Sequence, residues 1–226
     1  MPDKSITIKT LDGHSLSGYL ATPSVTPRAG LLILQEIFGV TSHIRQVTEE
    51  FARRGYLALA PALFDRLQPG VELPYTRIDE GRTLMQRLGL DDVASDLAGA
   101  VATLRAHLPA GAAVGAVGYC WGGAIADLAA CRTDIQAAVA YYGRANVGWL
   151  NEKPLCPILY HFGGKDALIP PEMIQQIRDG RPGAPAWVYP DAGHGFSCDE
   201  RPEFHAPSHE LALERTLAFF DQHLAR

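Results

Sequence analysis

The chain has 226 residues, of which 47% are hydrophobic and 20% charged, and its formal net charge is −5 at pH 7. This balance is typical of a globular protein, and the acidic charge disfavours nucleic acid or an anionic membrane as a partner, since both select clustered lysine and arginine. The sequence opens without the apolar region of a signal peptide and has no run of about 18 apolar residues, so a cytoplasmic protein without a membrane partner is expected.

Cysteine and histidine spacing gives no sign of a disulfide framework or a metal centre. Four cysteines lie at positions 120, 131, 156 and 198 without C-x-x-C spacing, which indicates reduced thiols. Among eight histidines only His205 and His209 are four residues apart, and a proline lies between them, so no metal site is predicted. No repeat or linker divides the sequence, and residues 1–226 are interpreted as a single domain.

The first half of the chain predicts a hairpin and then strands that alternate with helices. Two alternating segments flank a D-G turn signal near the start. Continuous apolar runs predict buried parallel strands at Ala29–Gln35 and Tyr56–Pro61. Helical spacing predicts helices over Ser42–Arg54, with Thr41 or Ser42 as the N-cap and Gly55 as the stop, and over Asp91–Leu108.

The second half continues the alternation. A strand at Ala113–Tyr119 runs into a helix of small residues, three more strands are predicted at 135–142, 157–162 and 184–189, and a helix at Ser208–His223 closes the chain. The predicted fold class is therefore α/β: a mostly parallel central sheet with helices on both faces and an antiparallel N-terminal edge. In such sheets, sites form beyond the carboxyl ends of the strands.

The strand at Ala113–Tyr119 ends in Gly118-Tyr119-Cys120-Trp121-Gly122. This is the G-x-S-x-G nucleophile elbow with cysteine in place of serine. The flanking glycines let the backbone pass closely at a tight strand-to-helix turn, and the N-terminus of the next helix favours a thiolate. The alternative is a buried structural cysteine in a glycine-rich turn.

Two further candidates, Asp166 and His194, each follow a later predicted strand. The order nucleophile, acid, histidine is that of the α/β-hydrolase triad. Either residue alone could be an ordinary turn or loop residue. Because the carboxyl ends of parallel strands meet at one edge, the three side chains Cys120, Asp166 and His194 are predicted to form a catalytic triad.

The QEIFG segment after the first buried strand supplies the next candidates. In an elbow fold this loop and the residue after the nucleophile provide the oxyanion-hole amides, which predicts the amides of Ile37 and Trp121. Glu36 is a carboxylate at the end of a buried strand, which is unfavourable unless it is paired. It either acts beside the nucleophile or forms a salt bridge, with Arg45 or Arg144 as candidate partners.

Four motifs in order resemble the dienelactone hydrolase (carboxymethylenebutenolidase) family: QEIFGV at 35–40, GYCWGGA at 118–124, GGKD at 163–166 and AGHGF at 192–196. The resemblance extends over nearly the whole chain. It implies the α/β-hydrolase fold, no metal, no cofactor and a small-molecule ester or lactone as substrate. It also implies the triad and oxyanion amides assigned above, with Glu36 helping to generate the thiolate when substrate binds and a thioester forming on Cys120. A monomer or small homo-oligomer is expected.

The resemblance also concerns substrate binding. Family members bind the substrate carboxylate with arginines, one of them four residues after the catalytic histidine, where this chain has Cys198. Another family arginine falls in the region of Arg77 and Arg82, and Arg82 is assigned to substrate binding. Arg201 could reach in from its loop, but a surface position is favoured, since most arginines are exposed. Tyr142, in the Tyr141–Tyr142 pair, is expected to line the pocket.

Two questions stay open at this level. Segment 64–89, polar and arginine-bearing, is either a mobile cap over the site or a solvated loop. The favoured function is a cysteine-dependent hydrolase of esters or lactones. The alternatives are a non-catalytic binding member of the same fold and a thiol redox sensor that pairs Cys120 with Cys198.

Overall fold

A computed structural model describes residues 4–224 and confirms the expected α/β architecture. Its eight strands form one sheet in the order β1-β2-β4-β3-β5-β6-β7-β8. The pairs β1–β2 and β2–β4 are antiparallel, and all later pairs are parallel. The strands are β1 (Ser5–Lys9), β2 (Ser15–Ala21), β3 (Ala29–Leu34), β4 (Tyr56–Pro61), β5 (Val114–Tyr119), β6 (Ala137–Tyr141), β7 (Ile158–Gly163) and β8 (Ala186–Tyr189).

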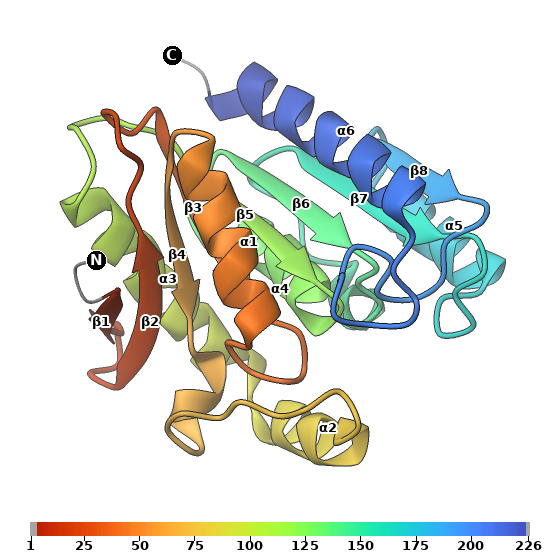
Figure 1. Ribbon diagram of the computed structural model, residues 1–226, viewed down its shortest axis with the longest axis horizontal. Helices are drawn as coiled ribbons and strands as arrows, with labels where there is room; N and C mark the ends of the chain where they lie inside the picture. Colours follow the sequence, from red (N-terminus) through yellow and green to blue (C-terminus); the bar gives the residue numbers. More distant parts are fainter. Residues whose placement is uncertain (1–3, 225–226) are drawn as a thin grey trace.

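Helices cover both faces of this sheet (Figure 1). Helices α1 (Ser42–Arg53) and α6 (Ala206–Leu224) lie on one face, and α3 (Leu90–Ala106) and α4 (Trp121–Arg132) lie on the other. Because both faces are covered, every residue of β3, β4, β5, β6 and β7 is buried, which explains their continuous apolar sequences. The edge strand β1 instead alternates in exposure.

The predicted elements are confirmed with small shifts at their ends. The N-terminal hairpin forms, and the two long helices begin or end within two residues of their predicted bounds. Of the two N-cap candidates for α1, Thr41 holds the position: its side-chain oxygen accepts a hydrogen bond of 3.4 Å from the Ile44 amide.

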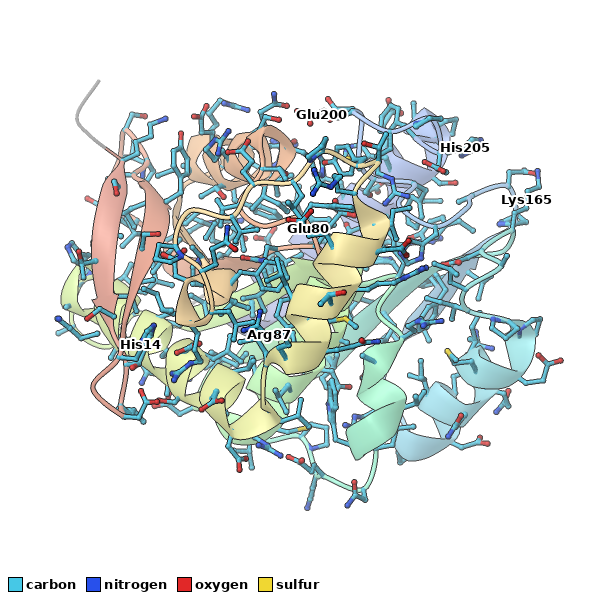
Figure 2. The ribbon with its side chains drawn as sticks, turned by 90° about the horizontal axis from the view of Figure 1, so that it is seen from below. His14, Glu80, Arg87, Lys165, Glu200 and His205 are labelled. Carbon is cyan, nitrogen blue, oxygen red and sulfur yellow. The ribbon has the colours of Figure 1, made fainter. Side chains whose placement is uncertain are left out.

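Segment 64–89 has more regular structure than its polar sequence indicates. It contains part of the 3₁₀ helix η1 (Leu63–Arg66) and the helix α2 (Ile78–Arg87). Figure 2 views the molecule from below, and α2 crosses the centre of that view in front of the sheet. The segment is thus placed over the edge where the parallel strands end. Its mobility stays a prediction.

Two further helices follow the later parallel strands. The 3₁₀ helix η2 (Ala145–Trp149) comes after β6, and α5 (Pro171–Gly180) comes after β7. Among residues 4–224, no helix is both long enough and apolar enough to cross a bilayer.

Candidate active site

The turn between β5 and α4 has the geometry of a nucleophile elbow. Cys120 has φ 55° and ψ −117°, a conformation that L-residues rarely adopt. Its amide donates to the Tyr141 carbonyl at 3.0 Å, and its carbonyl accepts from the Gly123 amide at 3.0 Å. A Cβ on Gly118 would lie 1.8 Å from the Gly122 carbonyl oxygen, so only glycine fits there. These contacts hold the strained residue in place and leave its side chain partly exposed.

The three residues predicted to form a triad do meet at this edge. His194 Nε2 lies 3.2 Å from Cys120 Sγ, and His194 Nδ1 lies 2.7 Å from Asp166 Oδ2. Asp166 is oriented in turn, because its Oδ1 accepts a 2.8 Å hydrogen bond from the Leu168 amide. The thiol, the imidazole and the carboxylate therefore form one continuous chain of contacts, which is the arrangement that a catalytic triad requires.

The environment of His194 favours its protonated form. Burial lowers the pKa of the imidazole, but the charge of Cys120 and the hydrogen bond with Asp166 outweigh this effect and raise the pKa to about 10. An imidazolium beside Cys120 is the arrangement that stabilises a thiolate. The ring also packs against the Tyr142 ring, with centroids 5.2 Å apart.

Tyr142 occupies a position different from the one expected. Its side chain is fully buried behind His194, in a residue with φ 40°, and it is not among the side chains that line the active-site cavity. Burial raises the pKa of its hydroxyl well above the ordinary value. Both tyrosines of the Tyr141–Tyr142 pair are core residues here, because the chain turns under the histidine loop directly after β6.

Glu36 is the buried acid of the site. Only 1% of the residue is exposed, and Oε1 lies 3.5 Å from Nη1 of Arg201, a long ion pair. Oε2 has no hydrogen-bond partner among residues 4–224. Burial raises the pKa of Glu36, against the lowering effect of the charges on Arg201, His43 and His194. The buried carboxyl group is therefore only partly satisfied: one oxygen forms a long ion pair, and the other has no hydrogen-bond partner among residues 4–224.

The partner of Glu36 differs from both candidates named from the sequence. Arg45 pairs with Glu72, with two contacts of 2.8 Å, and Arg144 donates to a backbone carbonyl. Arg201 turns inward instead, and only 13% of its side chain is exposed, so the expectation of a surface arginine was wrong.

Arg201 is supported by residues from segment 64–89. Its guanidinium lies over the Tyr75 ring, 5.6 Å from the centroid. The Tyr75 hydroxyl accepts a 3.2 Å hydrogen bond from Cys198 Sγ. Burial raises the pKa of the Cys198 thiol to about 12, which disfavours its thiolate form.

The two residues predicted to supply oxyanion amides, Ile37 and Trp121, are found at the same cavity as Cys120. Ile37 and Trp121 both line the cavity that contains Cys120, and among the described residues neither amide donates a hydrogen bond. Trp121 begins α4, so its N–H belongs to the free first turn of the helix. Two unengaged donors near a nucleophile are suited to a developing oxyanion.

The cavity over Cys120 has a volume of about 360 Å³, and its walls are mostly apolar. Three arginines interrupt this lining: Arg82 on α2, Arg144 before η2, and Arg201. The predicted substrate-binding residue Arg82 is thus at the cavity, although half of its side chain is exposed. An apolar pocket with a few cationic groups suits a small organic anion.

Comparison with known proteins agrees with this geometry. The family model described as "Dienelactone hydrolase family" matches residues 16–224. The chain belongs to the dienelactone hydrolase family. It is therefore a hydrolase of ester or lactone bonds.

Relatives within the family match over almost their full length. A Synechocystis protein provisionally named carboxymethylenebutenolidase is 34% identical, with 98% of each chain covered. The carboxymethylenebutenolidase of Pseudomonas putida is 32% identical over 97% of this chain and 96% of its own. A crystal structure of a Klebsiella pneumoniae protein, provisionally named dienelactone hydrolase, superposes with a TM-score of 0.86 at 30% identity, covering 97% of this chain and 98% of that one.

Sequence reasoning missed three members of this family site. It named an inward Arg201 but favoured a surface position, treated Arg144 only as a partner for Glu36, and did not consider Tyr75. For Arg201 the signal was its position in the loop that follows His194. For Tyr75 and Arg144 no local pattern distinguishes them from exposed loop residues.

Proposed function

We propose that this hydrolase cleaves esters or lactones through a thioester on Cys120. The observation that carries the proposal is the continuous contact from Cys120 through His194 to Asp166, at 3.2 and 2.7 Å. The strained backbone at Cys120, with φ 55°, supports it, because a structural cysteine has no need of such a conformation. The raised pKa of His194 agrees with a thiolate–imidazolium pair.

In the acylation step, the Cys120 thiolate attacks the carbonyl carbon and a C–S bond forms. The π electrons of the carbonyl move to its oxygen, which the amides of Ile37 and Trp121 stabilise, each by about 3 kcal/mol. The C–O bond to the leaving group then breaks, and the alkoxide or enolate takes a proton from protonated His194. The product of this step is the thioester with a neutral imidazole.

Deacylation reverses these roles. Neutral His194, oriented by Asp166, removes a proton from water, and the hydroxide attacks the thioester carbonyl. The same two amides stabilise the second oxyanion. The C–S bond then breaks, the acid is released, and Cys120 returns as a thiolate beside protonated His194.

Glu36 is proposed to assist thiolate formation. It is buried at the carboxyl end of β3, its Oε2 has no partner among residues 4–224, and burial raises its pKa toward the range in which a carboxylate accepts a proton. Arg201 pairs with the other oxygen at 3.5 Å. A long and partly satisfied ion pair can be exchanged for a substrate carboxylate, which frees Glu36 to take the proton of a resting Cys120 thiol. That proton returns from Glu36 to Cys120 when the product leaves and Arg201 pairs with Glu36 again.

The proposed substrate carries a carboxylate. Arg201 and Arg82 both line the cavity over Cys120, and a guanidinium is suited to bind a carboxylate in bidentate fashion. Arg201 thereby supplies the cation that the Cys198 position lacks. The net charge of −5 does not oppose this, because local charges dominate inside a cavity.

The test is turnover of a dienelactone beside a neutral activated ester, with wild type, Cys120→Ala and Cys156→Ala in parallel. Cys156 is a half-buried thiol outside this cavity and serves as the matched control. We expect efficient turnover of the dienelactone that is lost in Cys120→Ala and retained in Cys156→Ala. Turnover by Cys120→Ala near that of wild type would refute the nucleophile assignment. Turnover of the neutral ester alone would refute the proposal that the substrate carries a carboxylate.

A further inference from the structure

Arg144 is the cavity arginine without an acidic partner. It follows β6 and precedes η2, and its guanidinium is exposed at the cavity. Nη1 donates to the Leu168 carbonyl at 3.5 Å, which is long for a hydrogen bond. Within residues 4–224 no carboxylate oxygen lies within 4.0 Å of this guanidinium. Its positive charge is thus available to a ligand.

The other two cavity arginines are already paired. Arg201 contacts Glu36 at 3.5 Å and Glu203 at 3.3 Å, and Arg82 contacts Asp79 at 3.4 Å. Arg144 therefore differs from both because no acidic side chain is paired with its positive charge.

Arg144 also comes from a different element than the other two cavity arginines. Arg82 shares α2 with the lining residues Ile78 and Met85. The neighbours of Arg144 in the lining are Ala145, Val147, Leu168 and Met173, from η2, the β7–α5 loop and α5. A molecule bound over Cys120 thus meets cations carried by three separate parts of the chain, together with apolar side chains.

We propose that Arg144 is a specificity-determining residue that binds a second carboxylate of the substrate. The substrate class is then an ester or lactone with two free carboxylates, one held by Arg82 and Arg201 and the other by Arg144. This inference rests on the proposed function. The apolar side chains of Val147 and Met173 contact the carbon skeleton between the anionic groups, and the guanidinium of Arg144 fixes its orientation.

The test uses three p-nitrophenyl esters that differ in free carboxylates: the acetate with none, the hydrogen succinate with one, and the tricarballylate monoester with two. The variant is Arg144→Gln, and the control is Arg87→Gln, an exposed arginine of α2 that does not line the cavity and is labelled in Figure 2. For wild type we expect kcat/KM for the dicarboxylate to exceed that for the monocarboxylate. In Arg144→Gln this ratio should fall about fivefold, because a partly exposed ion pair is worth up to about that factor.

Two details identify a binding role. The loss should appear mainly in KM, and the wild-type preference for two carboxylates should weaken as salt is raised from 0.05 to 0.5 M, since the ion pair is exposed. Arg87→Gln should leave the ratio unchanged. An equal loss on all three esters in Arg144→Gln would show that Arg144 only supports the Leu168 and Asp166 loop, and would overturn the proposal.

The outcomes also separate this inference from the proposed function. Hydrolysis of all three esters by Cys120→Ala would remove the proposed function itself. Cys120-dependent hydrolysis with no wild-type preference for the second carboxylate would leave the proposed function intact and overturn the role of Arg144 alone.

Discussion

Helix α4 connects two buried polar clusters of opposite character. It begins beside Cys120, and less than two turns later Asp127 enters a second cluster. There Oδ1 accepts from Trp149 Nε1 and Arg181 Nη2, both at 2.8 Å, and Oδ2 accepts from Arg181 Nε at 3.0 Å and from the Tyr160 hydroxyl. Every oxygen of this buried carboxylate is satisfied.

The active-site cluster is incomplete by comparison. Oε2 of Glu36 and the hydroxyl of Tyr142 are buried without hydrogen-bond partners among residues 4–224, and Cys120 has a strained backbone. Unsatisfied polar groups and strain reduce stability, and they persist where the surrounding structure holds them for chemistry. We infer that the Asp127 cluster stabilises the fold, whereas the Cys120 cluster lowers stability and favours reactivity. Substitutions in the first cluster should therefore change mainly the free energy of unfolding, and substitutions in the second mainly the activity.

The largest effect on activity is expected from Cys120→Ser. A serine hydroxyl ionises far less readily than a thiol, and Glu36 is a poor base for it, so kcat/KM should fall by roughly 10³-fold or more with no loss of stability. Steady-state kinetics and urea unfolding of the same preparations measure both quantities. Equal or higher turnover by the serine variant would contradict the thiolate argument.

The opposite pattern is expected from Asp127→Asn. The substitution leaves the buried Arg181 without a charged partner and should lower the free energy of unfolding by about 3–5 kcal/mol. Activity of the folded fraction should change little. The control is Asp134→Asn, which removes an exposed ion pair with Arg105 and should cost less than about 1 kcal/mol. Equal losses of unfolding free energy in the two variants would show that the Asp127 cluster does not stabilise the fold more than an exposed ion pair does.

A smaller effect, dependent on pH, is expected from His194→Gln. The folded-state pKa of about 10 lies above the ordinary value of 6.5. The stabilising contribution of His194 is thus fully present below pH 6.5 and is lost as the pH rises through 10, on the order of 2 kcal/mol. Urea unfolding at pH 6 and pH 10.5 should show a large difference from wild type at the lower pH and almost none at the higher. A difference that grows with pH has the wrong sign for an imidazolium pair.

The smallest effect is expected from Glu36→Gln. Loss of the base should lower kcat/KM about tenfold, within the usual range for general bases. Burial raises the pKa of Glu36, so ionisation of this buried group lowers the free energy of unfolding of the wild type as the pH rises. The variant has no such charge and should be as stable as the wild type or more stable above neutral pH. Glu203→Gln removes the exposed carboxylate on the same arginine and is the control. Unchanged activity in Glu36→Gln would exclude its role as a base.

The difference between the two clusters also explains what the sequence could predict. Cys120, Asp166 and His194 each directly follow a buried strand, so the sheet topology alone brings them to one edge. The glycines at 118 and 122 indicate the elbow because a Cβ at either position would meet a carbonyl oxygen at 1.8 or 2.2 Å. Local rules of this kind can be read from sequence.

The remaining site residues depend on long-range partners. Arg201 turns inward because Glu36, 165 positions earlier, lacks another cation, and Tyr142 is buried because the histidine loop covers it. Arg144 looks like any exposed loop arginine until α5 and η2 are placed around it. The Asp127 cluster was missed for the same reason, since its members are 22 to 54 positions from Asp127 in the chain.

A thioester on Cys120 is tested most directly by the intact mass of His194→Ala mixed with an activated ester. Without a base for deacylation, the protein should gain the mass of one acyl group, and peptide mapping should place that group on Cys120 as a hydroxylamine-sensitive thioester. Cys120→Ala/His194→Ala should gain nothing. Ester cleavage by His194→Ala with no accumulated adduct, or with the acyl group on another residue, would contradict a thioester on Cys120.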